Sequence, residues 1–370
     1  MDKLIKNAIL LTLLITMAAA VPAQETALAN KVLDTPAASP LGIMKGRTPA
    51  QFAEPQLGPA TECGNIRRQF AVMNPVIVRG EPLIVRMLLE VIDPDDKAEF
   101  QAQLNFGADL KAVIYPPEGQ PYEFLGRQLG TNIPTSVVQM NDFERFRMDV
   151  RLAMDSETIS GSAFDIEGEY RIRFILMCSE EKELPRPQEM GVFNVKVLPA
   201  EGDDAKALEI LDDYTIFEAL QANTAVYGRR ELLSEENVRQ LSRLVSEAPK
   251  AALRPYAMML LADYYRKNEK KDSAGQLFQR VREEYPGHPV ATDSIFSEMN
   301  LHIGEANREK ARDLFLLAWT DPVFTQRIYP GSPAWRNFAE DYQPPEAGTQ
   351  WMIQKEPGPD PEFIEQEYEG

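Results

Sequence analysis

The sequence is poor in the residues from which most enzyme sites are built. It has two histidines, His288 and His302, and two cysteines, Cys63 and Cys178, in 370 residues. Neither histidine stands at ligand spacing from a cysteine or from the other histidine, which argues against a zinc site. No phosphate loop, G-x-G-x-x-G or G-x-S-x-G motif is present. The sequence therefore predicts no catalytic residue, no metal site and no cofactor.

Basic residues are outnumbered by acidic ones. The chain holds 39 Lys and Arg against 57 Asp and Glu, which gives a formal net charge of −18. Nucleic acid and anionic lipid would repel such a chain, so neither is expected as a partner. An enzyme of unrecognised type stays open, because the paired carboxylates of a glycoside hydrolase meet in space rather than in sequence.

Long apolar runs are absent except at the N-terminus. Lys3 and Lys6 precede an apolar stretch over 8–20, and Val21-Pro22-Ala23 ends in small residues. This pattern is typical of a signal peptide covering 1–23, with an uncleaved membrane anchor as the alternative. No cysteine stands near the cleavage site, which excludes a lipoprotein-type anchor. We therefore expect a periplasmic or extracellular protein, with no membrane insertion after signal cleavage.

The two cysteines are expected to pair. An isolated pair in an exported protein is typically oxidised, and two buried free thiols are the alternative. A bridge from Cys63 to Cys178 would close a loop of more than one hundred residues, worth about 4–5 kcal/mol in the chain-entropy model. Catalytic redox chemistry is not expected, since neither cysteine belongs to a C-x-x-C motif or lies near a histidine.

Residues 24–62 are rich in Ala, Pro, Thr and Gln and predict a flexible leader. From 63 to 199 the apolar residues recur with a period of two, most clearly over 83–91 and 145–152. Turn residues separate several such runs, and no helical pattern intervenes. The segment is therefore predicted to form an antiparallel β-sandwich.

One motif sharpens this prediction. Asp165, Gly168 and Tyr170 head the penultimate strand, and they resemble the tyrosine corner of immunoglobulin-like or fibronectin-like domains. The spacing has one inserted residue relative to antibodies, and Ile172 stands where an antibody has a cysteine. The resemblance implies that the Tyr170 hydroxyl bonds back to the backbone and locks the connection between the two sheets.

Arginines are the unusual surface feature of this segment. Three of them share a predicted strand face: Arg145, Arg147 and Arg151. On an acidic protein this face is a possible ligand patch for an acidic group. The alternative is cross-strand pairing with acidic neighbours, namely Glu90, Asp149 and Glu169.

Residues 204–341 carry helical periodicity, which predicts a multidomain β-then-α protein. Two helices are expected over 204–214 and 216–227. Ser234 is the expected N-cap of the next helix, and Asn237 is expected to break the full capping box. His288, in the turn between Gly287 and Pro289, is expected to pack or to cap the helix that follows.

The stretch from Arg254 to Pro289 resembles a tetratricopeptide repeat (TPR), whose pattern spans 34 residues. Small and aromatic residues stand at the positions where the two helices of such a repeat approach: Leu261, Ala262, Tyr265, Ala274, Phe278 and the terminal Pro286. A shifted second unit is suggested by helical patterns over 291–302 and 308–319. The resemblance implies C-terminal TPR-like helical hairpins.

Residues 342–370 form an acidic, Pro-rich tail, with the apolar insert Trp351-Met352-Ile353 either packed back on the helices or free as a docking motif.

Together these features favour a non-catalytic exported bacterial protein that binds a protein partner in the periplasm or cell envelope. The alternative is a module whose sandwich loops bind a cell-wall polymer or carbohydrate. The sequence leaves the partner and the oligomeric state open.

Overall fold

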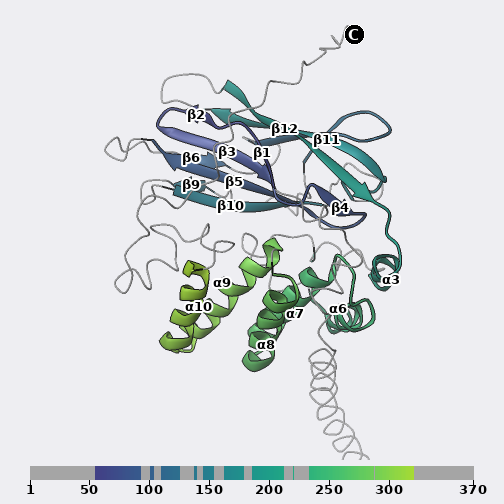
Figure 1. Cartoon of the computed structure of the whole chain (residues 1–370), viewed down its shortest axis with the longest axis vertical. Coiled ribbons are helices and arrows are strands. Elements are labelled where there is room, and N and C mark those ends of the chain that lie inside the picture. The colour runs from purple at the N-terminus through teal and green to yellow at the C-terminus, as the bar shows by residue number, and fades with distance from the viewer. Residues whose placement is uncertain are drawn as a thin grey trace, which may run out of the picture.

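The computed structural model has β-sheets in its N-terminal part and helices in its C-terminal part (Figure 1). It describes residues 55–92, 101–103, 110–125, 137–139, 145–153, 162–178, 186–211, 220, 233–286 and 288–320. The predicted signal peptide over 1–23 and the predicted tail over 342–370 lie outside these ranges, as does most of the helix predicted over 216–227. None of the helices in the described ranges combines the length and hydropathy of a membrane span.

The strands in the described ranges form two five-stranded sheets and one two-stranded sheet. The first sheet contains β1 (Gln56–Leu57), β2 (Thr61–Cys63), β3 (Ile66–Val72), β5 (Leu83–Val91) and β10 (Arg145–Leu152). The second contains β4 (Val76–Val78), β7 (Leu110–Tyr115), β8 (Tyr122–Phe124), β11 (Gly168–Cys178) and β12 (Arg186–Leu198). The small sheet pairs β6 (Gln101–Gln103) with β9 (Val137–Gln139).

The two large sheets enclose one apolar core, to which alternate residues of their strands contribute. Phe174 lies at its centre, with ring centroids 5.5 Å from Phe70 of the first sheet and 5.6 Å from Phe193 of the second. Gln56 closes one side, since its amide bonds the backbone of Asn194 across the gap between the sheets. The period of two over 63–199 therefore reports a two-layer core.

The pairing of β4 differs from the sequence prediction. The second sheet is mixed, because β4 pairs with β12 in parallel, whereas a wholly antiparallel arrangement was expected. After β3 the chain crosses to the second sheet for three residues and returns at Gly80, which has a φ of 90°. Asn74 stabilises the crossing by accepting from the Ile84 N–H at 2.7 Å and donating to the Pro82 carbonyl at 3.0 Å.

The ordered sheet also begins earlier than expected. Residues assigned to the flexible leader form β1 and all of β2 except its last residue, Cys63, and both strands pair with β3. Gly58 fits this position because a Cβ there would meet the Met190 carbonyl at 2.4 Å. Composition alone misplaced the boundary, since these two strands are too short to show a periodicity.

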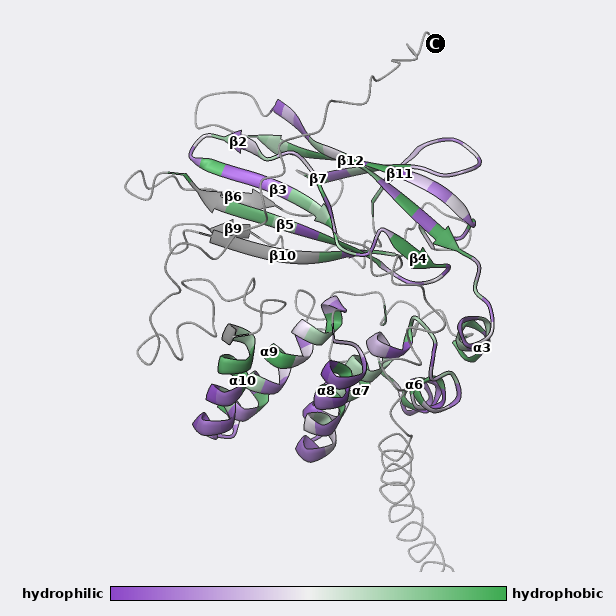
Figure 2. Cartoon of the chain, viewed as in Figure 1, coloured by the Kyte–Doolittle hydropathy of each residue, from purple (hydrophilic) through white to green (hydrophobic). Residues whose placement is uncertain are grey.

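The described helices are α3 (Asp203–Ile210), α6 (Glu235–Glu247), α7 (Arg254–Lys267), α8 (Lys271–Glu284), α9 (Pro289–Gly304) and α10 (Arg308–Thr320). Short turns join α7 to α8 and α9 to α10, and α7 also packs against α6 and α9. The hydrophilic side of α8 is visible in Figure 2, with the more hydrophobic α7 behind it. This helix order places α7 inside the helical layer.

The start of α6 corrects another expectation. Ser234 is its N-cap, and its hydroxyl accepts from the Asn237 N–H at 3.2 Å. Asn237 does not break the capping box: its side-chain oxygen accepts from the Ser234 N–H at 2.9 Å. The shorter amide side chain reaches the same backbone donor as the usual Glu or Gln.

The sheets and helices share a contact. Ile84 of β5 points away from the core between the sheets and belongs to the helical core, against which Met73 also packs. Arg151 of β10 lies opposite Ile84 in the strand register, so both side chains lie on the same face of the first sheet. The outer face of β5 and β10 is therefore the side on which the helices dock (Figure 1).

Candidate functional site

The disulfide predicted from the cysteine count is present. Cys63 of β2 is bonded to Cys178 of β11, with the Cα atoms 5.7 Å apart and a sequence separation of 115. Because β2 belongs to the first sheet and β11 to the second, the bond crosses the sandwich of the two sheets. It closes one end of their shared core.

The tyrosine motif forms the backbone contact that the resemblance implied. The Tyr170 hydroxyl donates to the Ile166 carbonyl at 2.9 Å and accepts from the Ile166 N–H at 3.2 Å. Gly168 has a φ of 138°, and a Cβ there would meet Pro117 at 2.9 Å, so both conformation and space require glycine. Burial raises the pKa of Tyr170 to about 12. The hydrogen bond to Ile166 lowers this pKa, but its effect is smaller than that of burial. Asp165 is exposed, at the start of this turn.

Arg151 is not part of an open ligand patch. Its side chain is 8% exposed and forms an ion pair with Asp293 of α9 at 3.7 Å. The guanidinium lies 5.1 Å from the ring centroid of Tyr256 of α7 and donates to the Leu220 carbonyl at 3.3 Å. The prediction of a surface patch is therefore wrong for this residue, because the helices cover it.

The other two arginines of the predicted patch, Arg145 and Arg147, lie on β10 opposite Glu90 and Leu88, and their side chains are outside the described part of the structure. On the second sheet, Arg173 of β11 bonds Glu189 of β12 at 2.7 Å, while Glu169, one of the acids named from the sequence, pairs with Lys196.

The residues predicted to pack the first helical hairpin lie together in the helical core. Five of them are at most 1% exposed: Leu261, Ala262, Tyr265, Ala274 and Phe278. Pro286 follows the end of α8 and is exposed. Alanine at two of these positions leaves room for α7 and α8 to approach, and the aromatic rings fill the space around that approach.

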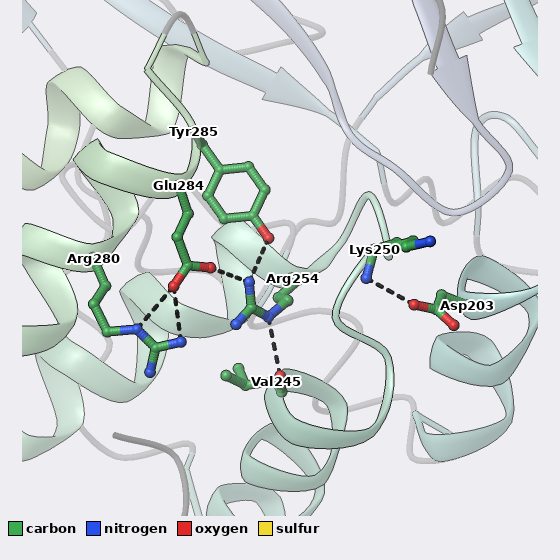
Figure 3. A network of polar contacts seen from close by, with 7 residues as sticks. All are labelled: Asp203, Val245, Lys250, Arg254, Arg280, Glu284 and Tyr285. Carbon is green, nitrogen blue, oxygen red and sulfur yellow. Dashed lines mark hydrogen bonds and ion pairs between the residues drawn. The ribbon is translucent and has the colours of Figure 1, made fainter. Parts of the chain in front are cut away.

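A buried polar network joins three helices (Figure 3). Arg254 of α7 is fully buried and donates from Nε to the Val245 carbonyl of α6 at 3.0 Å. Its Nη1 donates to the Glu284 carboxylate of α8 and, at 3.0 Å, to the Tyr285 hydroxyl. Glu284 also accepts from Arg280 Nε at 2.8 Å. Burial disfavours the charge on Arg254, but its neighbours Tyr285 and Glu284 outweigh burial and raise the pKa of Arg254.

Sequence reasoning missed this network. Arg254 and Glu284 lie 30 positions apart, and each reads as an ordinary charged residue on an amphipathic helix. The only available signal is that Arg254 begins α7 beside Pro255, at a position where an exposed helix would favour an acid.

Two further contacts fix α3 against the turn before α7: Asp203 accepts from the Lys250 N–H at 2.8 Å, and Asp204 from the Ala252 N–H at 2.6 Å.

Both histidines have structural contacts. His288 is the N-cap of α9, as expected, and its Nδ1 accepts from the Val290 N–H at 3.1 Å. His302 of α9 lies 3.7 Å from Glu298 of the same helix and 3.2 Å from Glu305, the residue at the C-cap of α9. Glu298 also pairs with Arg282, and Glu305 with Lys271, so these carboxylates are already neutralised. Among the described residues, no group of three or more acidic, His or Cys side chains is placed to hold a metal ion.

Comparison with known proteins gives no family. No family model matches the chain, and no curated protein matches it. Among solved structures, the chain is similar to the native conformation of alpha-2-macroglobulin from E. coli at 11% sequence identity and a TM-score of 0.17 over 75% of this chain. The chain spans 23% of the length of that protein. A TM-score this low supports no conclusion about fold or function.

Replacing Tyr170 by phenylalanine tests the tyrosine motif. We expect Tyr170→Phe to lower the free energy of unfolding by about 1 kcal/mol at neutral pH, because the Ile166 backbone loses its buried partner. The pKa of Tyr170 is raised in the folded state, so its contribution is complete below about pH 10 and is lost as the pH rises toward 12. Urea unfolding of both proteins at pH 7 and pH 11 measures this. A difference that does not shrink at pH 11 contradicts the assignment.

Replacing Glu284 by glutamine tests the polar network between the helices. We expect Glu284→Gln to lower the free energy of unfolding by about 3 kcal/mol, because the buried Arg254 would lose its anionic partner. The matched control is Glu283→Gln, an exposed neighbour on the same helix, with an expected effect within about 0.5 kcal/mol. Urea unfolding compares the two, and equal effects would show that the network does not stabilise the fold.

The ion pair between sheet and helices is testable by a double-mutant cycle. Arg151→Gln and Asp293→Asn are expected to be coupled by about 1 kcal/mol, since the arginine is buried but the aspartate is partly solvated. Thermal and urea unfolding of the two single variants and the double variant give the coupling energy. A value indistinguishable from zero would mean that the contact does not stabilise the docking of the helices.

Proposed function

We propose that this chain is a non-catalytic exported interaction protein whose helices bind a protein partner in the periplasm or cell envelope. In this proposal the two facing sheets are an immunoglobulin-like sandwich, supported by the Tyr170–Ile166 hydrogen bonds. The helices α7 to α10 are two TPR-like hairpins, supported by their order and by the contact between α7 and α9. The disulfide agrees with an oxidising compartment.

The observation that carries the proposal is the position of three half-buried apolar side chains. Tyr264 of α7 and Phe296 and Ile303 of α9 pack against the helical core but are not closed over by it. The outer helix α8 instead exposes polar residues, among them Asp272, Gln276 and Gln279. A protein partner would bury the remaining apolar area of the three side chains, and partly buried aromatic residues are typical anchors of protein interfaces.

The docking of the sheets leaves these residues in place. Arg151 and Ile84 contact α7 and α9 through Tyr256, Asp293 and the apolar core, toward the N-terminal ends of those helices. Tyr264 and Ile303 lie toward the opposite ends. The sheets therefore act as a rigid support for the helices in this proposal, and no rearrangement is needed for a partner to reach the exposed side chains.

Quantitative capture from an envelope extract tests the proposal. The full chain carrying Tyr264→Ser and Ile303→Ser is compared with a matched control carrying Gln276→Ser and Gln279→Ser on α8. We expect the first variant to capture at least about tenfold less protein than the wild type, because hot-spot side chains contribute about 2 kcal/mol or more to binding. The control is expected to capture as much as the wild type. Circular dichroism checks that both variants are folded.

Undiminished capture by the Tyr264→Ser and Ile303→Ser variant would contradict helical recognition. Binding of both variants and the wild type to purified cell-wall polymer, with no protein captured, would instead favour the sheets as the ligand-binding part.

A further inference from the structure

Arg68 of β3 is a fully buried cation, and its partners among the described residues are all neutral. Its Nη1 donates to the Met177 carbonyl at 3.1 Å and its Nη2 to the side-chain oxygen of Gln188, while its Nε has no hydrogen-bond partner. Burial lowers the pKa of Arg68 to about 10. No described carboxylate pairs with it, although buried charges in proteins are normally paired. Arg254 and Arg151, the other buried arginines discussed above, each contact an acid.

The position of Arg68 relates it to the disulfide. In the pairing of β2 with β3, Thr61 lies opposite Arg68 and Cys63 lies opposite Ile66. Residues that face each other across an antiparallel pair lie on the same side of the sheet, so the side chains of Cys63 and Arg68 share one face at diagonal positions. That face is the inner one, since Ile66 belongs to the core between the sheets.

Hydrogen bonds connect the same two strands as the disulfide. Arg68 bonds the carbonyl of Met177, the residue before Cys178, and also the side chain of Gln188. Gln188 in turn donates to the carbonyl of Glu62, the residue before Cys63, at 3.0 Å. These contacts link β2 to β11 through Gln188 of β12 and Arg68 of β3, in addition to the covalent link of the disulfide.

Since no described carboxylate pairs with Arg68, its charge is available to an anion that forms nearby. A disulfide is neutral, but its reduction produces thiolates, and Cys63 lies on the same inner face of the sheet as Arg68, diagonally across from it. A nearby cation stabilises a thiolate. We propose that Cys63–Cys178 is a thiol-exchange site for dithiol reductants, in which Arg68 stabilises Cys63 as a thiolate when the bond opens. This inference is independent of the proposed function.

The exposure of the two cysteines sets the direction of attack. Cys178 is partly exposed, whereas Cys63 is buried at 4% exposure, so an incoming thiolate reaches the Cys178 sulfur. Its attack forms a mixed disulfide with Cys178 and releases Cys63 as a thiolate beside Arg68. The second thiolate of the reductant then attacks the reductant sulfur that is bonded to Cys178 in the mixed disulfide. This closes the reductant into a cyclic disulfide and releases Cys178, which takes a proton from water. The protein gains two electrons and the dithiol loses two.

The rate of reduction by dithiothreitol tests the role of Arg68 in the full chain. Arg68→Gln keeps hydrogen-bonding capacity but removes the charge. The matched control, Arg67→Gln, removes the same charge from the neighbouring residue, whose side chain is 37% exposed. Because a leaving thiol of higher pKa leaves more slowly, we expect reduction to slow about threefold in Arg68→Gln for each unit by which the Cys63 pKa rises. The control is expected to match the wild type. Equal rates in the two variants would overturn the proposal.

The pH dependence of alkylation gives a second measurement. Iodoacetamide labelling of the reduced wild-type protein is expected to have its midpoint below the free-cysteine value of about 8.5. The midpoint should rise in Arg68→Gln and stay low in Arg68→Lys, which keeps the charge. If Arg68→Gln does not fold, the wild type and Arg68→Lys still decide. A wild-type midpoint at or above 8.5 shows that burial dominates the thiols, and the proposal fails.

Discussion

The outer face of β5 cannot remain in water, and the covering of that face organises the molecule. Leu83, Val85 and Met87 fill the core between the sheets, while Ile84, Arg86 and Leu88 on the opposite face are also buried. A strand that is buried on both faces needs a layer on each side. The second sheet supplies one layer, and the helical core, which includes Ile84, supplies the other at this end of the strand. The β part and the α part are therefore joined by hydrophobic burial as well as by chain connectivity.

This constraint changes how the helices are understood. A short array of helical hairpins buries its apolar faces only with the help of further packing. Here α7 is covered by α6, α8, α9 and the first sheet, and its residues from Arg254 to Ala262 are all buried. The buried Arg254–Glu284 pair fits such an environment, because a charge in that position must be neutralised once water is excluded. The same covering removes Arg151 from the surface and makes it the polar part of the contact between β10 and the helices.

The sequence predicted those features that depend on local pattern. The hairpin between Arg254 and Pro289 was predicted within a few residues, because apolar spacing and the turn near Asn268 are local. The β-then-α order and the long strands β5, β10 and β11 were likewise evident from periodicity. By contrast, the parallel pairing of β4, the early strands β1 and β2, and the contact of Glu284 with Arg254 all depend on partners distant in the sequence. Alternation placed Arg151 on an outward strand face correctly but contained no information on what covers that face.

Three of the buried arginines, Arg68, Arg151 and Arg254, show how far such reasoning can be taken once the structure is known. Each lies where water is excluded, so each must be neutralised or must bear the cost of an unpaired charge. Arg254 has Glu284, and Arg151 has Asp293 together with the Tyr256 ring. Among the described residues, Arg68 bonds neutral oxygens only, and the Cys63–Cys178 disulfide, whose Cys63 shares a face of the sheet with Arg68, can become anionic through its reduction. The unpaired charge is thus a cost to the oxidised protein that would be relieved in the reduced one, which makes the closed end of the sandwich the place where this fold is sensitive to thiols.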